Sequence, residues 1–301
     1  MNGSVRSSAE MVWHHQRLVW WIFAVNLVIA WLSSLSVRAT LSTILDHSLE
    51  SAKLVKGFDI STLILLAQRP DVSLRALAPG AIGATLVFVV YLLFIDGGVF
   101  AVFLDDRKLS RAEFFENAGL FFWRMVRLAS YSVVPFGLLA AAHGGMHTYA
   151  EKLASDAPQE RLGFLVSLGA NLAIALAALF VRLWFDLAQA RVVKDNEHRV
   201  LAALGSSLAL AFRSGKLYAG YIGIGLFAAT TFAIGVGLLI SLPHSAISAS
   251  FLILELVTIT QIASRLWLKA ASARYVALLP SEAYSPLFPL PVQETLSPLS
   301  Q

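Results

Sequence analysis

Two histidines four residues apart form the first pattern in this chain whose residue types and spacing could do chemistry. Glu151 follows His147 at the interval that separates His147 from His143, so a helix would place three zinc ligands on one face. The two glycines between the histidines disfavour such a helix, and no general-base glutamate lies inside the pair. We therefore expect loop histidines at a membrane surface and no metal site. The adjacent His14 and His15 are a weaker candidate still.

A stretch of twelve residues, in which arginine, leucine and tryptophan follow a long apolar run, occurs twice. Residues 182–193 and 265–276 carry the same residue at seven of the twelve positions, eighty-three residues apart. A weaker echo lies ninety residues upstream of the first copy, where Asp96 corresponds to Asp186. These correspondences predict an internal repeat and three related helical hairpins.

The charged residues of the repeat are predicted to anchor the helices at the membrane surface. Arg182 and Asp186 lie four residues apart, so they can neutralise each other on one helical face. Their counterparts Arg265 and Lys269 are both basic and cannot pair with each other. We therefore expect the arginines to reach the cytoplasmic headgroups, beside two tryptophans of the same stretches, rather than to bind a substrate. These tryptophans are Trp184 and Trp267.

Glu255 is the carboxylate furthest from either end of its apolar run, and it suggests a polar site near the membrane midplane. It precedes Arg265 by ten residues, which places it about 15 Å deeper along a helix. Asn26, Asn171 and Thr230 fall near the same depth in other apolar runs. The predicted cluster has two interpretations, which are hydrogen bonding between helices and a site for an ion or solute.

No pattern in the chain supports catalysis. We find no Ser-His-Asp arrangement in a nucleophile-elbow context, no glycine loop for a phosphate and no carboxylate pair at catalytic spacing. Cysteine is absent, which excludes disulfides, thiolate nucleophiles and cysteine metal sites. We therefore expect a protein that is not an enzyme and that uses no cofactor.

The composition indicates a membrane protein. Hydrophobic residues make up 57% of the 301 residues, charged residues make up 14%, and the mean hydropathy is +0.70. Lysines and arginines lie between apolar runs, so they indicate topology rather than nucleic-acid binding. Of the 23 basic residues, 15 fall in segments that six spans place on the side of the termini and 7 on the other side. This imbalance predicts that both termini are cytoplasmic.

The predicted fold is an all-α polytopic membrane bundle with six transmembrane helices in three hairpins. The apolar runs that can cross a hydrocarbon core of about 30 Å are 18–37, 79–103, 125–142, 162–188, 218–242 and 246–268. Amphipathic segments are expected in an extracytoplasmic insert and, as interfacial helices, after spans two and four. These segments are 38–79, 111–128 and 200–212. The domain division is a cytoplasmic N-terminus at 1–17, a membrane domain at 18–276 and a Pro-rich disordered cytoplasmic tail at 277–301.

Three short motifs resemble those of a broad group of bacterial six-helix membrane proteins. They are Asp-Gly-Gly at 96–98, Phe-Trp-Arg-Met-Val-Arg-Leu at 122–128, and Asp186 followed by Ala190-Arg191. The group includes the membrane domain found beside some glycerophosphodiester phosphodiesterases, and the likeness covers residues 78–276. It implies a six-helix domain of the bacterial inner membrane built from related hairpins. It carries over no catalytic residues, because this chain has no room for the separate soluble phosphodiesterase domain.

The function expected from the sequence is that of a non-enzymatic inner-membrane protein that organises lipid or partner proteins. Membrane lipids are the expected partners, together with a protein that binds the cytoplasmic helices or the Pro-rich tail. The alternative is a carrier or channel for a small solute, with its polar site at Glu255.

Overall fold

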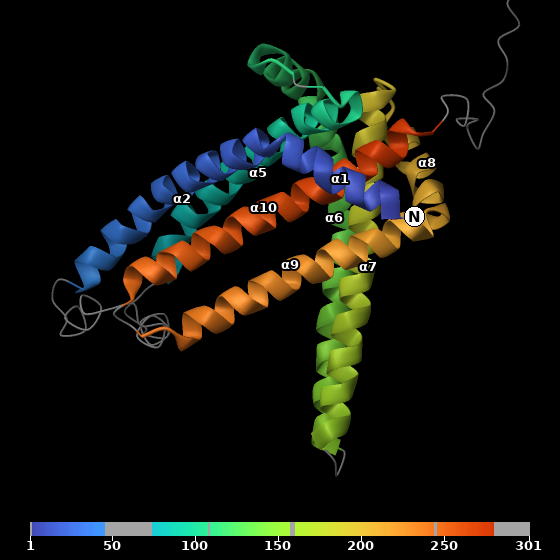
Figure 1. Cartoon of the computed structure of the whole chain (residues 1–301). Helices are drawn as coiled ribbons and strands as arrows, with labels where there is room; N and C mark the ends of the chain where they lie inside the picture. The colour runs from blue at the N-terminus through green and yellow to red at the C-terminus, as the bar shows by residue number, and fades with distance from the viewer. Residues whose placement is uncertain (1, 46–73, 108, 157–159, 244–245, 280–301) are drawn as a thin grey trace, which may run out of the picture.

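The computed structural model describes residues 2–45, 74–107, 109–156, 160–243 and 246–279, and the regular elements in these ranges are all helices (Figure 1). Six are long and apolar enough to cross a membrane. They are α2 (Gln16–Leu45), α5 (Leu74–Asp105), α6 (Arg111–Asp156), α7 (Glu160–Lys194), α9 (Gly215–Ser241) and α10 (Ile247–Ala277). Two shorter helices are α1 (Asn2–His14) and α8 (Val200–Arg213). The described residues therefore confirm an all-helical fold with six helices that could each cross a membrane, which fits an integral membrane protein.

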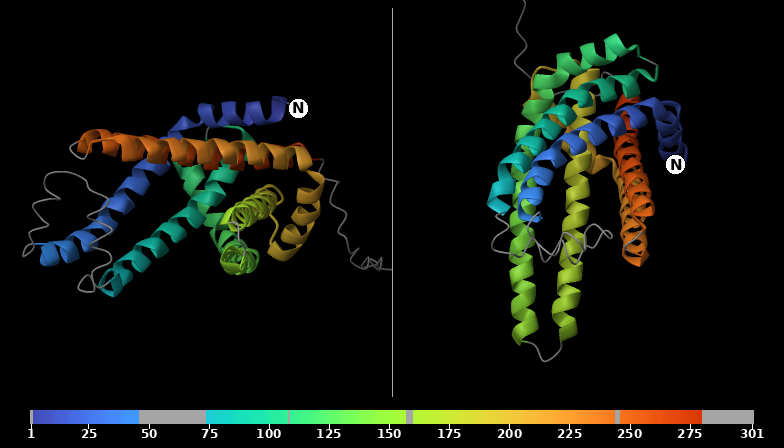
Figure 2. Two further views of the ribbon diagram at one scale, coloured as in Figure 1. Left: turned by 90° about the horizontal axis from the view of Figure 1, so that it is seen from below. Right: turned by 90° about the vertical axis from the view of Figure 1, so that its left-hand side faces the viewer.

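The long helices meet in one region of the molecule and diverge from it, with α6 and α7 running in one direction and α2, α5, α9 and α10 in another (Figures 1 and 2). Consecutive helices pack together as α2 with α5, α6 with α7, and α9 with α10. Side chains near the meeting end are buried, and Phe100, Leu183 and Tyr221 have no exposed surface. In the diverging halves, by contrast, large apolar side chains such as Val133 and Ile240 are exposed. So much exposed apolar surface is what the lipid-facing part of an integral membrane protein carries.

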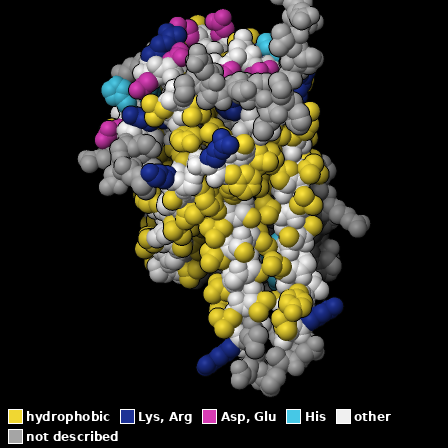
Figure 3. Space-filling model, turned by 90° about the vertical axis from the view of Figure 1, so that its right-hand side faces the viewer, with side chains coloured by type: hydrophobic (Ala, Val, Ile, Leu, Met, Phe, Trp, Pro, Cys, Tyr) yellow, Lys and Arg dark blue, Asp and Glu magenta, His cyan; other side chains and the backbone are white. Residues whose placement is uncertain are grey.

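The surface of the molecule has the same division. Figure 3 shows charged side chains gathered at one end of the visible face, hydrophobic side chains along its length and basic side chains at the far end. This order of charged, apolar and charged zones is the one that a bilayer imposes on a spanning protein.

Helix α6 corrects the predicted boundary between an interfacial helix at 111–128 and a span at 125–142. It is one continuous helix of 46 residues, about 69 Å long at 1.5 Å per residue, which is roughly twice the thickness of a hydrocarbon core. It also carries His143 and His147, which the sequence interpretation placed in a loop. The glycines at 144 and 145 do not interrupt it. In lipid an interrupted helix exposes backbone groups that water cannot satisfy, so weak helix formers stay helical.

Helix α5 contains the Asp-Gly-Gly motif at 96–98. The helix continues through Gly97 and Gly98 to Asp105. A Cβ atom at residue 97 would lie 2.9 Å from the Cβ of Phe121, and one at residue 98 would lie 2.8 Å from the Phe114 ring. The two glycines therefore permit α5 and α6 to approach closely, as small residues commonly do in membranes.

Helices α5 and α7 end in the same backbone conformation. Asp106 and Asn196 have φ values of 47° and 49°, the left-handed conformation that asparagine and aspartate tolerate after a helix. They are ninety residues apart, the interval of the weaker sequence echo. The ammonium group of Lys194 donates hydrogen bonds to the carbonyls of Val276 at 2.8 Å and Leu279 at 3.0 Å, which ties the end of α7 to the end of α10.

The structure also assigns the polar ends of the membrane domain. The predicted N-terminal polar segment contains α1, which packs against α10. Helix α8 packs against α7. The predicted amphipathic insert at 38–79 begins inside α2 and ends inside α5, and its central part at 46–73 lies outside the described residues, as does the tail at 280–301.

Candidate functional site

The charged residues of the repeat come together where the long helices meet. Lys269 on α10 forms an ion pair with Asp96 on α5. Only 13% and 14% of these two side chains are exposed, so the pair is largely removed from water. The ammonium nitrogen of Lys269 also lies 5.2 Å from the centre of the Phe100 ring, within the range of a cation–π contact.

A second pair lies on α7 next to the first. The guanidinium Nε of Arg182 is 3.7 Å from Oδ2 of Asp186, whose side chain is buried. The hydroxyl of Tyr221 on α9 donates to the same oxygen at 2.8 Å. Asp186 is thus neutralised from its own helix and held by a neighbouring one, which satisfies a carboxylate inside the membrane domain.

Tyr221 connects this carboxylate to α10. Its hydroxyl lies 3.0 Å from the carbonyl of Leu268 and within hydrogen-bond distance of the Ser272 hydroxyl. A tyrosine has a single hydroxyl hydrogen, so we assign it to the charged acceptor Asp186, and Ser272 donates to the tyrosine oxygen. Three helices therefore share one buried hydrogen-bond network.

A cavity of about 200 Å³ lies beside these pairs, between α2, α5, α7 and α10. Its polar lining side chains are Asn26, Asp96, Arg182, Arg265 and Lys269, and the remainder of its wall is apolar. With the adjacent Asp186, the cluster holds three cations and two carboxylates, a formal charge of +1.

Arg265 is the unbalanced cation of the cluster. Its side chain is exposed on α10 and lines the cavity, and among the described residues it forms no hydrogen bond or ion pair. Asn26, on the same wall, has a buried side-chain oxygen with no hydrogen-bond partner. The arrangement leaves a positive charge and an unsatisfied polar atom facing one space.

The two predicted tryptophan anchors contact protein. The indole N–H of Trp184 donates to the carbonyl of Leu204 on α8 at 2.8 Å. The indole N–H of Trp267 donates to the hydroxyl of Ser8 on α1 at 3.1 Å. The tryptophans therefore fasten the two short helices to α7 and α10.

The four residues of the predicted midplane cluster do not lie in one cavity. Asn26 lines the cavity around Arg265, whereas Asn171 lies with His143 in a different and much smaller cavity between α6 and α7. Thr230 is exposed on α9. Glu255 is half-buried on α10, and its carboxylate has no hydrogen bond or ion pair with the described residues.

The predicted metal-ligand spacing occurs on a helix without forming a metal centre in the described part of the chain. The rings of His143 and His147 are 6.5 Å apart, and Nδ1 of His147 lies 3.2 Å from a carboxylate oxygen of Glu151. No three histidine, aspartate or glutamate side chains of the described residues are placed to hold one ion.

The sequence analysis missed the ion pair between Asp96 and Lys269 and the role of Tyr221 in the buried hydrogen-bond network. One signal could have found the pair. Arg265 and Lys269 are two cations on one helix without a local partner, so they require a carboxylate from another helix, and Asp96 stands at the equivalent level in the ninety-residue echo. Tyr221 has no comparable signal in the sequence.

Comparison of the chain with family models, with curated proteins and with solved structures finds no match.

Proposed function

We propose that this is a non-enzymatic protein of the bacterial inner membrane that organises anionic lipid, with the cavity around Arg265 receiving the phosphate of a lipid headgroup. The observation that carries the proposal is the unpaired, exposed guanidinium at the edge of a cavity with a net positive charge. Basic pockets between membrane helices are typical sites for anionic headgroups.

The walls of this cavity fit the remainder of a lipid. The apolar side chains of Leu92, Ile95 and Ile262 line it beside the charges. Further along α5 and α10, Leu86 and Leu252 are exposed, so an acyl chain leaving the cavity meets apolar surface. The charged side of the cavity can thus bind the headgroup of a lipid, and the apolar surface of α5 and α10 can contact its acyl chains.

The test compares lipid binding by the full chain and two variants in detergent, measured by native mass spectrometry during titration with phosphatidylglycerol or phosphatidylcholine. Arg265→Gln should weaken phosphatidylglycerol binding about five-fold, the factor for one basic residue at an anionic group. Arg127→Gln is the control, because Arg127 is exposed on α6 and unpaired among the described residues. Equal affinity of wild type and Arg265→Gln for phosphatidylglycerol would reject the proposal.

The topology proposed for this function places both termini in the cytoplasm, so the cavity serves the cytoplasmic leaflet. Reporter fusions at Glu10 and Ser206 should then report cytoplasm, and a fusion at Ser155 the opposite side. A cytoplasmic signal at Ser155 would exclude this orientation.

A small-solute carrier or channel is the second candidate. It is favoured by Glu255, a half-buried carboxylate inside a span with no partner among the described residues. Ionisable groups in such positions often mark ion or proton pathways. Substitution of Glu255, described in the Discussion, separates the two functions.

A further inference from the structure

A second cavity, of about 400 Å³, lies where the corner between α1 and α2 meets the end of α5 and the start of α6. Its walls come from residues 14–18 and 21, from Val102, and from residues 109–111, 114 and 115. None of these residues lines the cavity around Arg265. Its chemistry can therefore be considered on its own.

Two cations line this cavity without a counter-charge. Arg17 at the start of α2 and Arg111 at the start of α6 are both exposed, and neither forms an ion pair or hydrogen bond with the described residues. No aspartate or glutamate belongs to the described lining. Two arginines that line one cavity favour an anion there.

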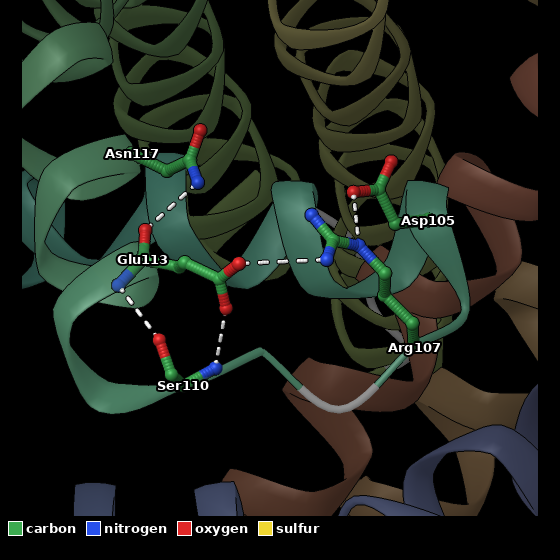
Figure 4. Close-up of polar contacts among 5 residues, drawn as sticks. All are labelled: Asp105, Arg107, Ser110, Glu113 and Asn117. Carbon is green, nitrogen blue, oxygen red and sulfur yellow. Dashed lines mark hydrogen bonds and ion pairs between the residues drawn. The ribbon is translucent and has the colours of Figure 1, made fainter.

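The nearby carboxylate of Glu113, in the first turn of α6, is occupied by other contacts (Figure 4). One oxygen of Glu113 accepts a hydrogen bond from the backbone N–H of Ser110 at 2.7 Å, and the other lies 3.5 Å from a guanidinium nitrogen of Arg107. The hydroxyl of Ser110 in turn accepts from the backbone N–H of Glu113 at 3.2 Å. This capping box fixes the start of α6 and commits Glu113 to it, so the carboxylate does not neutralise the arginines of the cavity.

His15 also lines the cavity, and one nitrogen of its ring has no hydrogen-bond partner among the described residues. Its side chain is 8% exposed, and Nδ1 lies 2.9 Å from the carbonyl oxygen of Met11. A carbonyl can only accept, so Nδ1 carries the hydrogen. Nε2 is buried without a partner in the described residues. A phosphate oxygen can accept from a protonated ring at this nitrogen, and a hydroxyl group can donate to a neutral one.

The remainder of the wall is apolar and aromatic. The rings of Trp21 and Phe115 pack at a tilt with their centres 5.6 Å apart, and Phe114 packs edge-on against Phe115 at 5.5 Å. All three side chains line the cavity. The space is therefore amphipathic, with positive charge on one side and an apolar surface on the other, as a site for an amphipathic anion requires.

We propose that this cavity binds the phosphate group of an amphipathic phosphate ester, with Arg17 and Arg111 holding the phosphate and Nε2 of His15 completing its hydrogen bonds. The aromatic wall receives the apolar part of the molecule. A phospholipid headgroup and a soluble phosphate ester present the same group, so the experiment includes both. The inference does not rest on the proposed function, because the two cavities share no residue.

The experiment measures binding to the full chain in detergent by native mass spectrometry, with phosphatidylglycerol and glycerol 3-phosphate as separate probes. Arg17→Gln and Arg111→Gln should each weaken binding of the preferred probe about five-fold, and together about thirty-fold. The control Arg127→Gln/Arg213→Gln removes the same charge from exposed positions outside both cavities and should change binding less than about two-fold. Unchanged thermal unfolding midpoints verify that each variant is folded.

The outcomes separate the sources of the phosphate and the two cavities. A loss confined to phosphatidylglycerol identifies a lipid, and a loss confined to glycerol 3-phosphate identifies a soluble ester. Arg265→Gln, assayed in parallel, reports on the other cavity, so either site can fail alone. The inference is overturned if the Arg17→Gln/Arg111→Gln variant binds both probes as wild type does, or if it differs no more than the control pair.

Discussion

Breaking the Asp96–Lys269 pair should destabilise the helix bundle, and the two ways of breaking it should differ. In the wild type, Arg182, Arg265 and Lys269 face two carboxylates, Asp96 and Asp186. Asp96→Asn raises the formal charge of the cluster from +1 to +2 and leaves Lys269 without a carboxylate partner. Lys269→Met lowers the charge to zero, and Asp96 still has two guanidinium groups beside the same cavity.

The magnitudes follow from this charge balance. Leaving one partner of a buried ion pair uncompensated costs about 3–5 kcal/mol. We expect Asp96→Asn to fall in this range, because three cations that repel one another then face a single carboxylate, Asp186. Lys269→Met removes one charge-assisted contact, worth about 1.5–3 kcal/mol, and it relieves repulsion at the same time. The double variant should be more stable than Asp96→Asn alone, because it removes the unpaired cation.

Thermal unfolding of the purified variants in one detergent, followed by loss of the monodisperse peak, ranks these stabilities. Chemical unfolding of the same samples gives the free-energy differences. If Lys269→Met is the less stable single variant, the charge-balance argument is wrong. If both single variants unfold as wild type does, the pair is solvated and does not hold α5 to α10.

Three further changes test other contacts. Gly97→Ala should destabilise by on the order of 1–3 kcal/mol through overpacking against Phe121, whereas Gly119→Ala, whose Cβ would meet nothing within 4 Å, should be neutral or stabilising in the same thermal assay. Ser110→Ala should cost about 1 kcal/mol by removing the cap of α6, and a melting curve identical to wild type would refute this role. Glu255→Gln should fold normally and, in a proton-coupled carrier, abolish the pH dependence of function. The carrier hypothesis fails if Glu255→Gln matches wild type in every cellular phenotype while Glu255→Leu lowers thermal stability.

The six long apolar helices could be predicted because each depends on local composition. A run of about 20 apolar residues meets the length requirement of the hydrocarbon core whatever its neighbours are. The capping box at Ser110 and Glu113 is local in the same sense, because it depends on two residues three positions apart. Features that depend on a few consecutive residues are thus accessible from a single sequence.

The ends of the helices were harder to predict because the rules for helix ends assume water, which can hydrogen-bond the backbone groups that an end exposes. Gly97, Gly98 and the glycines at 144 and 145 would weaken a helix in solution. In lipid the alternative is an unsatisfied backbone, so the helices continue through all four positions. The paired glycines of α5 are instead explained by Phe121 and Phe114 on the neighbouring helix, which no local pattern reveals.

In the charged cluster, residue spacing predicts the ion pair within one helix but not the ion pair between helices. The interval of four residues correctly placed Arg182 near Asp186, but it could state only that Arg265 and Lys269 do not pair with each other. A cation inside a membrane domain requires a partner or access to water. A cation without a partner on its own helix therefore predicts a carboxylate on another helix at the same level of the membrane domain. Asp96 is this carboxylate for Lys269, and their ion pair joins α5 to α10. Arg265 has no ion pair or hydrogen bond among the described residues, and Asp96, which lines the same cavity, is already paired with Lys269. This excess of positive charge where the helices converge is the reason for proposing a bound anion there.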